Sequence, residues 1–287
     1  MNKSFTLIEI LVVIVIIGIL SAFIIVGMAG VSEKATIAKG QAFSSSLKNA
    51  LMLNLVSEWR MDDASGTNVK DYWDSNDGTW SGPVGSYTSP SWRTASECVS
   101  GGCLAFDGTD DYIDCGAGTN LSISTTITVG AWIKFSSVHF GTIISKEGAS
   151  SGYMLFVYSD GAAYFQVFRG ASWAQVHASV STNQWAYLTG VYNGSNTILY
   201  INGVAGTPVA GSGSIATNSN RLAIGVISPD MGLNYYFNGL IDDVRIYNQS
   251  IPTSQIQQNY YSGLNRLLAG QSIDSREYVK RLALEEN

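Results

Sequence analysis

The sequence predicts a mostly β head of two packed antiparallel sheets, carried behind one N-terminal helix long enough to cross a membrane. Apolar residues are concentrated at the start, where 21 of the 27 residues from Phe5 to Val31 are apolar. Short strand-like runs then alternate with turn signals over residues 58–269. Only 13% of the 287 residues are charged and the net charge is −6, which excludes a disordered chain and a basic nucleic-acid-binding protein.

The first element is a long apolar segment that carries one acid. No charged residue occurs from Ile10 to Val31, and these 22 residues exceed the roughly 20 that a helix needs to cross a bilayer core. A secretory signal peptide has an apolar region of only about 7–15 residues, so this run is too long for one. A carboxylate such as that of Glu9 is costly in hydrocarbon, and its presence indicates a function. We therefore expect a membrane span over residues 8–31.

The residues around Glu9 resemble the N-terminus of type IV pilins and pseudopilins. The matching residues are Lys3-Ser4-Phe5-Thr6-Leu7-Ile8-Glu9, followed by the apolar run. The resemblance implies that prepilin peptidase cuts between Ser4 and Phe5 and that the new Phe5 amine is N-methylated. It also implies that Glu9 pairs with the Phe5 ammonium of a neighbouring subunit, an attraction that a low dielectric strengthens. The family usually has Gly before the cut, and this chain has Ser4.

The same helix is expected to continue beyond the membrane to residue 57. Residues 32–58 contain no Pro and a single Gly, and Leu47, Ala50 and Leu51 recur at roughly helical spacing. Pilin-like proteins have one long helix whose second half packs on a globular head. The predicted organisation is a leader over residues 1–4, a helix over residues 5–57, a head over residues 58–269 and a polar tail over residues 270–287.

The head contains strand-like runs separated by tight-turn dipeptides. Asp160-Gly161 and Asn193-Gly194 each separate two such runs, and Asn202-Gly203 marks a third turn. These residue types tolerate the positive φ angles of hairpin turns. Strands that recur about every 8–12 residues indicate a sandwich or jelly roll. After Pro252, the spacing of apolar residues from 254 to 268 predicts an amphipathic helix.

Three segments of the head resemble laminin-G-like, concanavalin A-like jelly rolls. They occur in the family's order, at residues 59–79 (beginning Trp59-Arg60-Met61-Asp62-Asp63), residues 104–113 (including Phe106-Asp107-Gly108) and residues 237–248 (including Gly239-Leu240-Ile241-Asp242-Asp243). The resemblance covers roughly residues 57–268. It implies two packed antiparallel sheets of about 12–14 strands in total. It also implies binding of glycans or proteins, and one structural calcium ion.

The aspartates of the head are the candidate calcium ligands. Thirteen of its sixteen acids are Asp, and calcium takes roughly six to eight oxygen ligands. The resemblance brings the early-loop acids and the closing-strand Asp to one sheet edge. Asp242 is in phase with Val244 and Ile246, so we expect it to point inward and to need a partner. The candidate ligands are Asp71, Asn76, Asp77 and Asp242. The alternative is that acids such as Asp71, Asp77, Asp107 and Asp110 only cap turns.

Aromatic and cysteine residues supply the remaining candidates. Sugars stack on exposed aromatic faces, and six aromatic residues lie in or near predicted loops. These candidate glycan-stacking residues are Trp73, Trp80, Trp92, Trp173, Tyr235 and Tyr236. The alternative is that each packs in the core, as we expect for Trp132 and Trp185. Cys98 and Cys103 flank four residues, a spacing that allows a small disulfide loop outside the cytoplasm, and Cys115 is expected to be free and buried.

Together these features predict a pilin-like subunit of a type IV pilus or related filament, with a lectin-like head for adhesion or surface binding. The expected partners are other pilin subunits, prepilin peptidase, the membrane, and glycans or surface proteins. The expected location is the cytoplasmic membrane with the head outside, or an extracellular filament.

Two other functions are compatible with parts of this pattern. One is a pseudopilin of a type II secretion system. The other is a membrane-tethered glycan-active enzyme, which the sequence disfavours because it lacks a Glu-x-Asp-x-x-Glu pattern and the head has only Glu58, Glu97 and Glu147. No catalytic residues are therefore expected.

Overall fold

The computed structural model describes residues 54–81 and 91–283. The predicted leader, the processing residues Ser4 and Phe5, the assembly residue Glu9 and the predicted membrane span lie outside these residues. Within the described part, no helix is long and apolar enough to cross a membrane. This part holds seventeen strands, two α-helices and the short 3-10 helices η1 (Thr119–Leu121) and η2 (Pro229–Met231).

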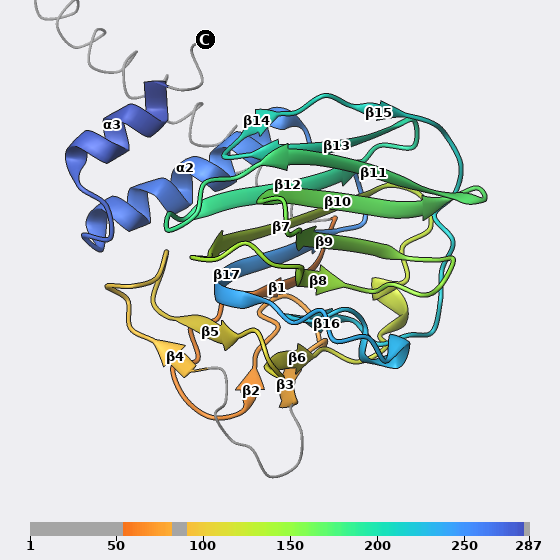
Figure 1. The fold of residues 1–287 in the computed structure, drawn as a ribbon, viewed down its shortest axis with the longest axis horizontal. Helices are drawn as coiled ribbons and strands as arrows, with labels where there is room; N and C mark the ends of the chain where they lie inside the picture. The colour runs from red at the N-terminus through yellow and green to blue at the C-terminus, as the bar shows by residue number, and fades with distance from the viewer. Residues whose placement is uncertain (1–53, 82–90, 284–287) are drawn as a thin grey trace, which may run out of the picture. The chain divides into compact units, whose positions relative to one another are not determined.

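Nine of the strands form one antiparallel sheet, sheet A (Figure 1). Its order is β14-β13-β12-β7-β17-β5-β4, with β1 paired to β17 and β15 paired to β13. The strands are β1 (Leu55–Trp59), β4 (Ser91–Arg93), β5 (Cys103–Asp107), β7 (Ile127–Lys134), β12 (Ala186–Tyr192), β13 (Asn196–Ile201), β14 (Val204–Ala205), β15 (Val209–Ala210) and β17 (Asn238–Tyr247). The long closing strand β17 therefore lies in the middle of sheet A, between β7 and β5.

The other eight strands form sheet B, in the order β11-β10-β9-β8-β16-β6-β3-β2. They are β2 (Asn68–Val69), β3 (Gly78–Ser81), β6 (Tyr112–Asp114), β8 (Gly141–Ser145), β9 (Tyr153–Val157), β10 (Ala162–Arg169), β11 (Ser172–Ser179) and β16 (Ala223–Ile224). The predicted fold of two antiparallel sheets is confirmed. The strands are more numerous than the predicted 12–14 because four of the seventeen are only two residues long.

The three predicted turns join the pairs of strands expected from the sequence. Asp160-Gly161 connects β9 to β10, Asn193-Gly194 connects β12 to β13, and Asn202-Gly203 connects β13 to β14. Gly161, Gly194 and Gly203 all have positive φ, at 80°, 90° and 86°. Glycine adopts this region without a steric penalty, so the turn dipeptides determine the register of these hairpins.

The main core lies between the two sheets and is built by alternation along each strand. On β9, Tyr153, Leu155 and Val157 point into this core, whereas Met154 and Phe156 belong to a separate apolar cluster on the outer face of sheet B. Alternation on β10 and β11 follows the same pattern. As a result, the outer face of sheet B carries large apolar side chains of its own.

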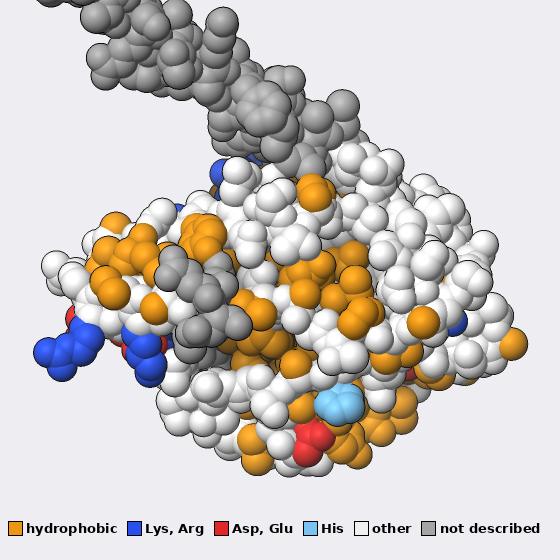
Figure 2. All heavy atoms as spheres, turned by 90° about the horizontal axis from the view of Figure 1, so that it is seen from above, with side chains coloured by type: hydrophobic (Ala, Val, Ile, Leu, Met, Phe, Trp, Pro, Cys, Tyr) orange, Lys and Arg blue, Asp and Glu red, His pale blue; other side chains and the backbone are white. Residues whose placement is uncertain are grey.

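Two helices cover the outer face of sheet A. The buried side of α2 (Thr253–Ala269) presents Ile256, Tyr260, Leu264 and Leu267 to an apolar cluster on that face. The ring of Tyr260 stacks on that of Trp132 at 5.6 Å between centroids. This confirms the predicted helix over residues 254–268. The predicted polar tail contains a further helix, α3 (Ser275–Ala283), over which basic side chains gather on the face shown in Figure 2.

The predicted start of the head is three residues too late. The helix was expected to reach residue 57, but Leu55–Trp59 forms β1, whose five residues are all buried. Strand β1 pairs antiparallel with β17, from Leu55 opposite Tyr247 to Trp59 opposite Val244. The helical spacing upstream did not reveal this boundary, because pairing with a distant strand decides the conformation of residues 55–57.

Candidate functional site

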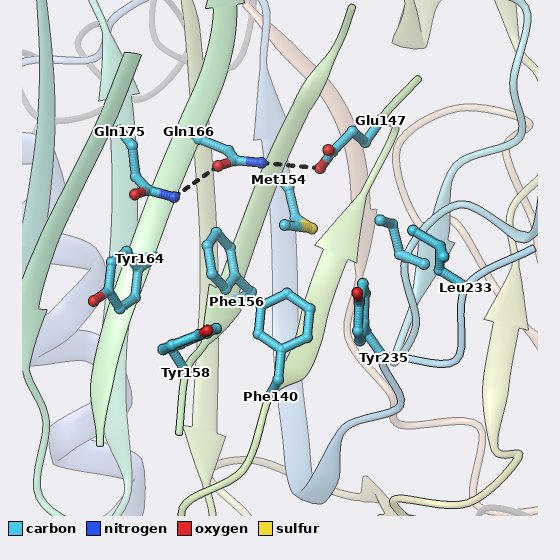
Figure 3. A pocket seen from close by; sticks show the side chains of 11 residues that line it. Phe140, Glu147, Met154, Phe156, Tyr158, Tyr164, Gln166, Gln175, Leu233 and Tyr235 are labelled. Carbon is cyan, nitrogen blue, oxygen red and sulfur yellow. Dashed lines mark hydrogen bonds between the residues drawn. The ribbon is translucent and has the colours of Figure 1, made fainter. Parts of the chain in front are cut away.

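A groove of about 370 Å³ opens on the outer face of sheet B (Figure 3). Its floor is made by outward-facing side chains of neighbouring strands, namely Met154 and Phe156 from β9, Tyr164 and Gln166 from β10, and Gln175 from β11. Its sides are made by residues of the connecting segments, namely Phe140, Tyr158, Ile227, Leu233 and Tyr235, and by Glu147, which follows β8. The groove thus rests on regular strands and is bordered by loops.

Aromatic rings dominate the groove and contact one another. Phe140 makes edge-to-face contacts with Phe156, Tyr158 and Tyr235, with centroids 5.2, 5.2 and 4.1 Å apart. Tyr164 stacks on Phe156 at 5.1 Å. Tyr158 and Tyr235 remain 45% and 37% exposed, so the groove offers solvent a large aromatic surface. Neighbouring contacts hold the rings in place without covering their outer faces.

A row of three polar side chains runs beside the rings (Figure 3). Gln175 Nε2 donates a hydrogen bond to Gln166 Oε1 at 2.8 Å, and Gln166 Nε2 donates to Glu147 Oε2 at 3.1 Å. Each amide nitrogen keeps a second N–H. Burial raises the pKa of Glu147 from its ordinary value to about 7, against the opposing effect of the Gln166 hydrogen bond. Rings and hydrogen-bonding groups therefore lie side by side, which suits a ligand with one apolar face and several hydroxyls.

The six predicted glycan-stacking aromatics do not gather in one place. Tyr235 lines the groove, and Tyr236 packs instead against Tyr112 at 6.4 Å. Trp80 and Trp92 stack on each other at 6.3 Å and pack against the main core. Trp173 makes an edge contact with Phe168, while Trp73 is 41% exposed and lies outside the groove. Trp132 and Trp185 are buried, as expected.

Three groove residues, Met154, Phe156 and Tyr158, belong to a run with a recognisable signal in the sequence. A strand with one solvated face should alternate apolar and polar residues, whereas residues 153–158 are almost all apolar or aromatic. A strand that is apolar at every position has apolar side chains on both faces of its sheet. The outer face must then be covered as well, or bind a ligand. Glu147, Gln166 and Gln175 carry no such signal, since isolated polar residues at strand positions are ordinary.

Three of the predicted calcium ligands meet in the loop over residues 71–77. Asp71 is buried, and its Oδ1 accepts hydrogen bonds from the backbone N–H of Glu58 and Trp73, both at 3.0 Å. Asn76 turns its amide nitrogen toward Asp71 Oδ2 at 3.4 Å, and Asp77 Oδ1 accepts the Asp71 N–H at 2.8 Å. These contacts stabilise the turn.

Asp242 lies elsewhere and faces away from the main core, contrary to the expected phase. Val244 and Ile246 point into the inter-sheet core, but a bulge in β17 interrupts the alternation between Asp242 and Arg245, and Asp243 has a φ of 49°. Asp242 Oδ2 accepts hydrogen bonds from the N–H groups of Val99 and Ser100, at 2.9 and 3.2 Å. Burial and the neighbouring carboxylate of Asp243 raise the pKa of Asp242 well above its ordinary value.

One acidic triad among the described residues has carboxylate oxygens within 4.8 Å of one another, and it is not the predicted set. It consists of Asp107, Asp110 and Asp111, in the turn between β5 and β6. Asp107 Oδ1 accepts the N–H of Thr109 at 2.7 Å, so it caps this turn. Hydrogen bonds join Asp71, Asn76 and Asp77 to one another, whereas those of Asp242 go to Val99 and Ser100. Calcium binding stays a prediction, which melting with and without EDTA tests.

The loop held by Asp242 contains the disulfide. Cys98 and Cys103 are bonded to each other, and Cys115 is free and buried. Besides its bonds to β17, the loop contacts the segment between α2 and α3, where Ser272 Oγ donates to the Cys98 carbonyl at 3.2 Å. The disulfide loop therefore connects sheet A to the segment between α2 and α3.

Comparison with family models gives two matches. A model described as the concanavalin A-like lectin/glucanases superfamily matches residues 107–257, just over half of the chain. A model of the prokaryotic N-terminal methylation motif matches residues 1–25. No curated protein matches the sequence.

Solved structures with a similar fold include carbohydrate-related and toxin domains. Domain 4 of AbnA, a GH43 extracellular arabinanase from Geobacillus stearothermophilus, in complex with arabinotriose, is 20% identical with a TM-score of 0.55, over 71% of this chain and 97% of that chain. The botulinum neurotoxin serotype D binding domain is 16% identical with a TM-score of 0.56, over 75% and 53%. The serotype G binding domain is 13% identical with a TM-score of 0.57, over 74% and 51%. The matched region thus spans about half of the neurotoxin binding domains, and at these identities the likeness concerns the fold.

Proposed function

Because the chain belongs to the concanavalin A-like lectin/glucanases superfamily and carries a prokaryotic N-terminal methylation motif, we propose that it is a pilin-like subunit whose head binds carbohydrate. The binding site in this proposal is the groove on the outer face of sheet B. The observation that carries it is the pairing of exposed aromatic rings with the row Glu147, Gln166 and Gln175.

The groove suits a sugar because a sugar ring has two kinds of surface. Its C–H groups pack on an aromatic face, and its hydroxyls both donate and accept hydrogen bonds. Tyr158 and Tyr235 supply exposed rings, while the spare amide N–H groups of Gln166 and Gln175 supply donors. A purely apolar ligand would leave the polar row without partners, at a cost in free energy.

The fold comparison gives modest support of its own. The arabinanase domain was solved in complex with arabinotriose, so a domain of this fold and about this size holds an oligosaccharide.

Binding is favoured over hydrolysis. Glycosidases ordinarily use two carboxyl groups, about 5–9.5 Å apart, on either side of the scissile bond. Among the described residues that line the groove, Glu147 is the only carboxylic acid. A single acid supports recognition of a hydroxyl better than it supports this chemistry.

The N-terminal motif supports the rest of the proposal. A methylation motif at residues 1–25 fits processing between Ser4 and Phe5 by prepilin peptidase and assembly with other pilin subunits. The filament would then display the head outside the cytoplasmic membrane. Adhesion to glycan-bearing surfaces is the activity that we propose for it.

Loss of an aromatic at the groove tests the proposed site. The full chain, purified in a detergent that is not itself a glycoside, is applied to an oligosaccharide array, and affinities for the ligands found are measured by calorimetry. We expect Tyr235→Ala to weaken binding several-fold to about tenfold, because a sugar loses one stacking face. Tyr72→Ala is the matched control, since Tyr72 is also 37% exposed but does not line the groove.

Two outcomes would contradict the proposal. Absence of binding to any glycan on the array would overturn carbohydrate binding itself. Equal weakening by Tyr235→Ala and Tyr72→Ala would show that the glycan binds outside the groove. Melting temperatures of the two variants are compared in parallel, so that a folding defect is recognised.

A further inference from the structure

We propose that the groove selects glycans without acidic groups, because Glu147 places a carboxylate beside the sugar site and none of the described lining residues is basic. This inference rests on the proposed function and adds the chemical class of its ligand. It assigns Glu147 two roles, acceptance of a hydrogen bond from a sugar hydroxyl and exclusion of carboxylate- or sulfate-bearing sugars.

The charged groups at and near the groove are carboxylates. Glu147 is the only Asp, Glu, Lys or Arg among the described lining residues. A second carboxylate lies near the other end, where Tyr164 donates its hydroxyl hydrogen to Asp160 Oδ2 at 2.6 Å. The nearest lysine in sequence, Lys146, donates from Nζ to the Asn220 carbonyl at 2.6 Å and does not line the groove. An anionic ligand would therefore meet negative charge without a partner.

Glu147 can still accept a hydrogen bond from a ligand. Its Oε2 accepts from Gln166, whereas no group in the described part of the chain donates to its Oε1. Its backbone is anchored on both sides, since its N–H donates to Ser145 Oγ at 3.1 Å and its carbonyl accepts from Asn220 Nδ2 at 2.8 Å. The carboxylate is thus held in position with one oxygen free to accept.

The Glu147 side chain is buried. Glu147 is only 9% exposed, so little water screens its charge. An approaching carboxylate would lose its own hydration and face an unscreened like charge, whereas a hydroxyl would gain a charge-assisted hydrogen bond. Like charges placed together across an interface reduce affinity strongly. We expect matched neutral and acidic oligosaccharides to differ in affinity by about 100-fold or more.

The test uses the full chain at pH 8 with pairs of oligosaccharides that differ only in one group, a hydroxymethyl in one member and a carboxylate or sulfate ester in the other. Wild type is expected to bind the neutral members and to reject the acidic ones. Glu147→Gln keeps the shape of the side chain and an acceptor for Gln166, so it should fold. We expect this variant to bind neutral members about tenfold more weakly and acidic members more tightly than wild type does.

A pH series adds a second measurement. Protonation of Glu147 should make wild type behave like Glu147→Gln near pH 5, while the selectivity of the variant stays constant from pH 5 to pH 8. The other ionisable groups that line the groove are the phenols of Tyr158, Tyr164 and Tyr235, and the hydrogen bond to Asp160 raises the pKa of Tyr164 to about 12. His177 stacks on Tyr164 at 4.9 Å, and Glu147→Gln leaves this contact in place, so the variant reveals any change with pH that does not come from Glu147.

The possible results distinguish failure of the selectivity proposal from failure of glycan binding in the groove. Binding of acidic glycans as tightly as neutral ones, with loss of binding in Tyr235→Ala, overturns the selectivity and leaves the groove as a glycan site. Unchanged selectivity in Glu147→Gln overturns the role of Glu147. Absence of any glycan binding overturns both proposals.

Discussion

Glu147 is a residue that the fold keeps at a cost. Burial raises the pKa of its carboxyl from 4.5 to about 7, so the folded chain holds this proton over a pH range where the unfolded chain releases it. The folded state binds more protons between these two values. Stability contributed at low pH is therefore lost as the pH rises from about 4.5 to about 7, and the full cost is present above that range.

This cost gives the first prediction. Glu147→Gln removes the ionisation and keeps the acceptor for Gln166. At pH 8 we expect the variant to be more stable than wild type, by an amount on the order of 3 kcal/mol at most. The difference should shrink toward zero near pH 4.5, which serves as an internal control. Chemical denaturation across this range measures it, and a difference independent of pH would contradict the assignment to Glu147.

The burial of Asp242 is predictable from the sequence, but the direction of its side chain is not. Its burial and its need for a partner could be predicted from its place in an apolar strand. Its direction could not, because the bulge at Asp243 reverses the alternation that the prediction assumed. The two arginines that hold Asp243, Arg245 and Arg266, come from β17 and α2, and their convergence depends on tertiary packing.

At the scale of elements, helix α2 can approach sheet A closely because a glycine lies at the contact. Gly263 lies on the buried side of the helix, and a Cβ placed there would lie 2.4 Å from Cζ2 and 2.5 Å from Cε2 of Trp132. Trp132 is fully buried between Tyr187 and Tyr260, with centroids 5.3 and 5.6 Å away. The indole has no free space in which to move away.

Replacement of this glycine by alanine should therefore destabilise the fold, although helix propensity alone would favour alanine. Gly→Ala in an exposed helix interior ordinarily stabilises by about 1 kcal/mol. We expect Gly263→Ala to destabilise by about 1–3 kcal/mol, because the added methyl overpacks the contact with Trp132. Ser262→Ala, at an exposed position one residue earlier, is the matched control and should be neutral or stabilising by a few tenths of a kcal/mol. Equal effects of both substitutions on thermal unfolding would contradict close packing of α2.

Elements with local signals were predictable and those with distant partners were not. Asp-Gly and Asn-Gly dipeptides identified three hairpins, and Pro252 with amphipathic spacing identified α2. Strand β1 was missed because its partner β17 lies almost 190 residues later in the chain. The groove was missed for a related reason. Its floor joins β9, β10 and β11, but Leu233 and Tyr235 arrive from a loop that sheet topology alone brings there.

At the scale of the whole molecule, the charge pattern separates the two regions of the chain. Nine basic and sixteen acidic residues leave residues 58–269 with a net charge of −7, and residues 1–57 carry +2. On the face seen in Figure 2, hydrophobic and uncharged side chains predominate, and the basic ones stand out over α3, which lies after residue 269. A net charge of −7 on the head opposes the approach of anionic partners, so recognition of an uncharged ligand depends on shape and hydrogen bonds.

The final prediction concerns Glu9, which belongs to the matched methylation motif. If Glu9 neutralises the N-terminal ammonium of a neighbouring subunit within the filament, Glu9→Ala should remove this subunit from filaments while leaving the head folded and able to bind its ligand. Each charge is costly alone in an apolar surrounding, so loss of one partner leaves the other unpaired. Electron microscopy of surface filaments, with antibody against the head, measures incorporation.

Two companion variants make the result interpretable. Glu9→Asp keeps the charge and should retain part of the incorporation, whereas Glu33→Ala removes an acid beyond the uncharged run and should leave assembly intact. Membrane levels of each variant are compared by immunoblot, because a subunit that is degraded would also be absent from filaments. Glu9→Ala present in the membrane at wild-type level and incorporated normally would sink the assembly role. Head-mediated glycan binding, measured on the same variants, would be unaffected by that result, because its residues lie on sheet B and its bordering loops.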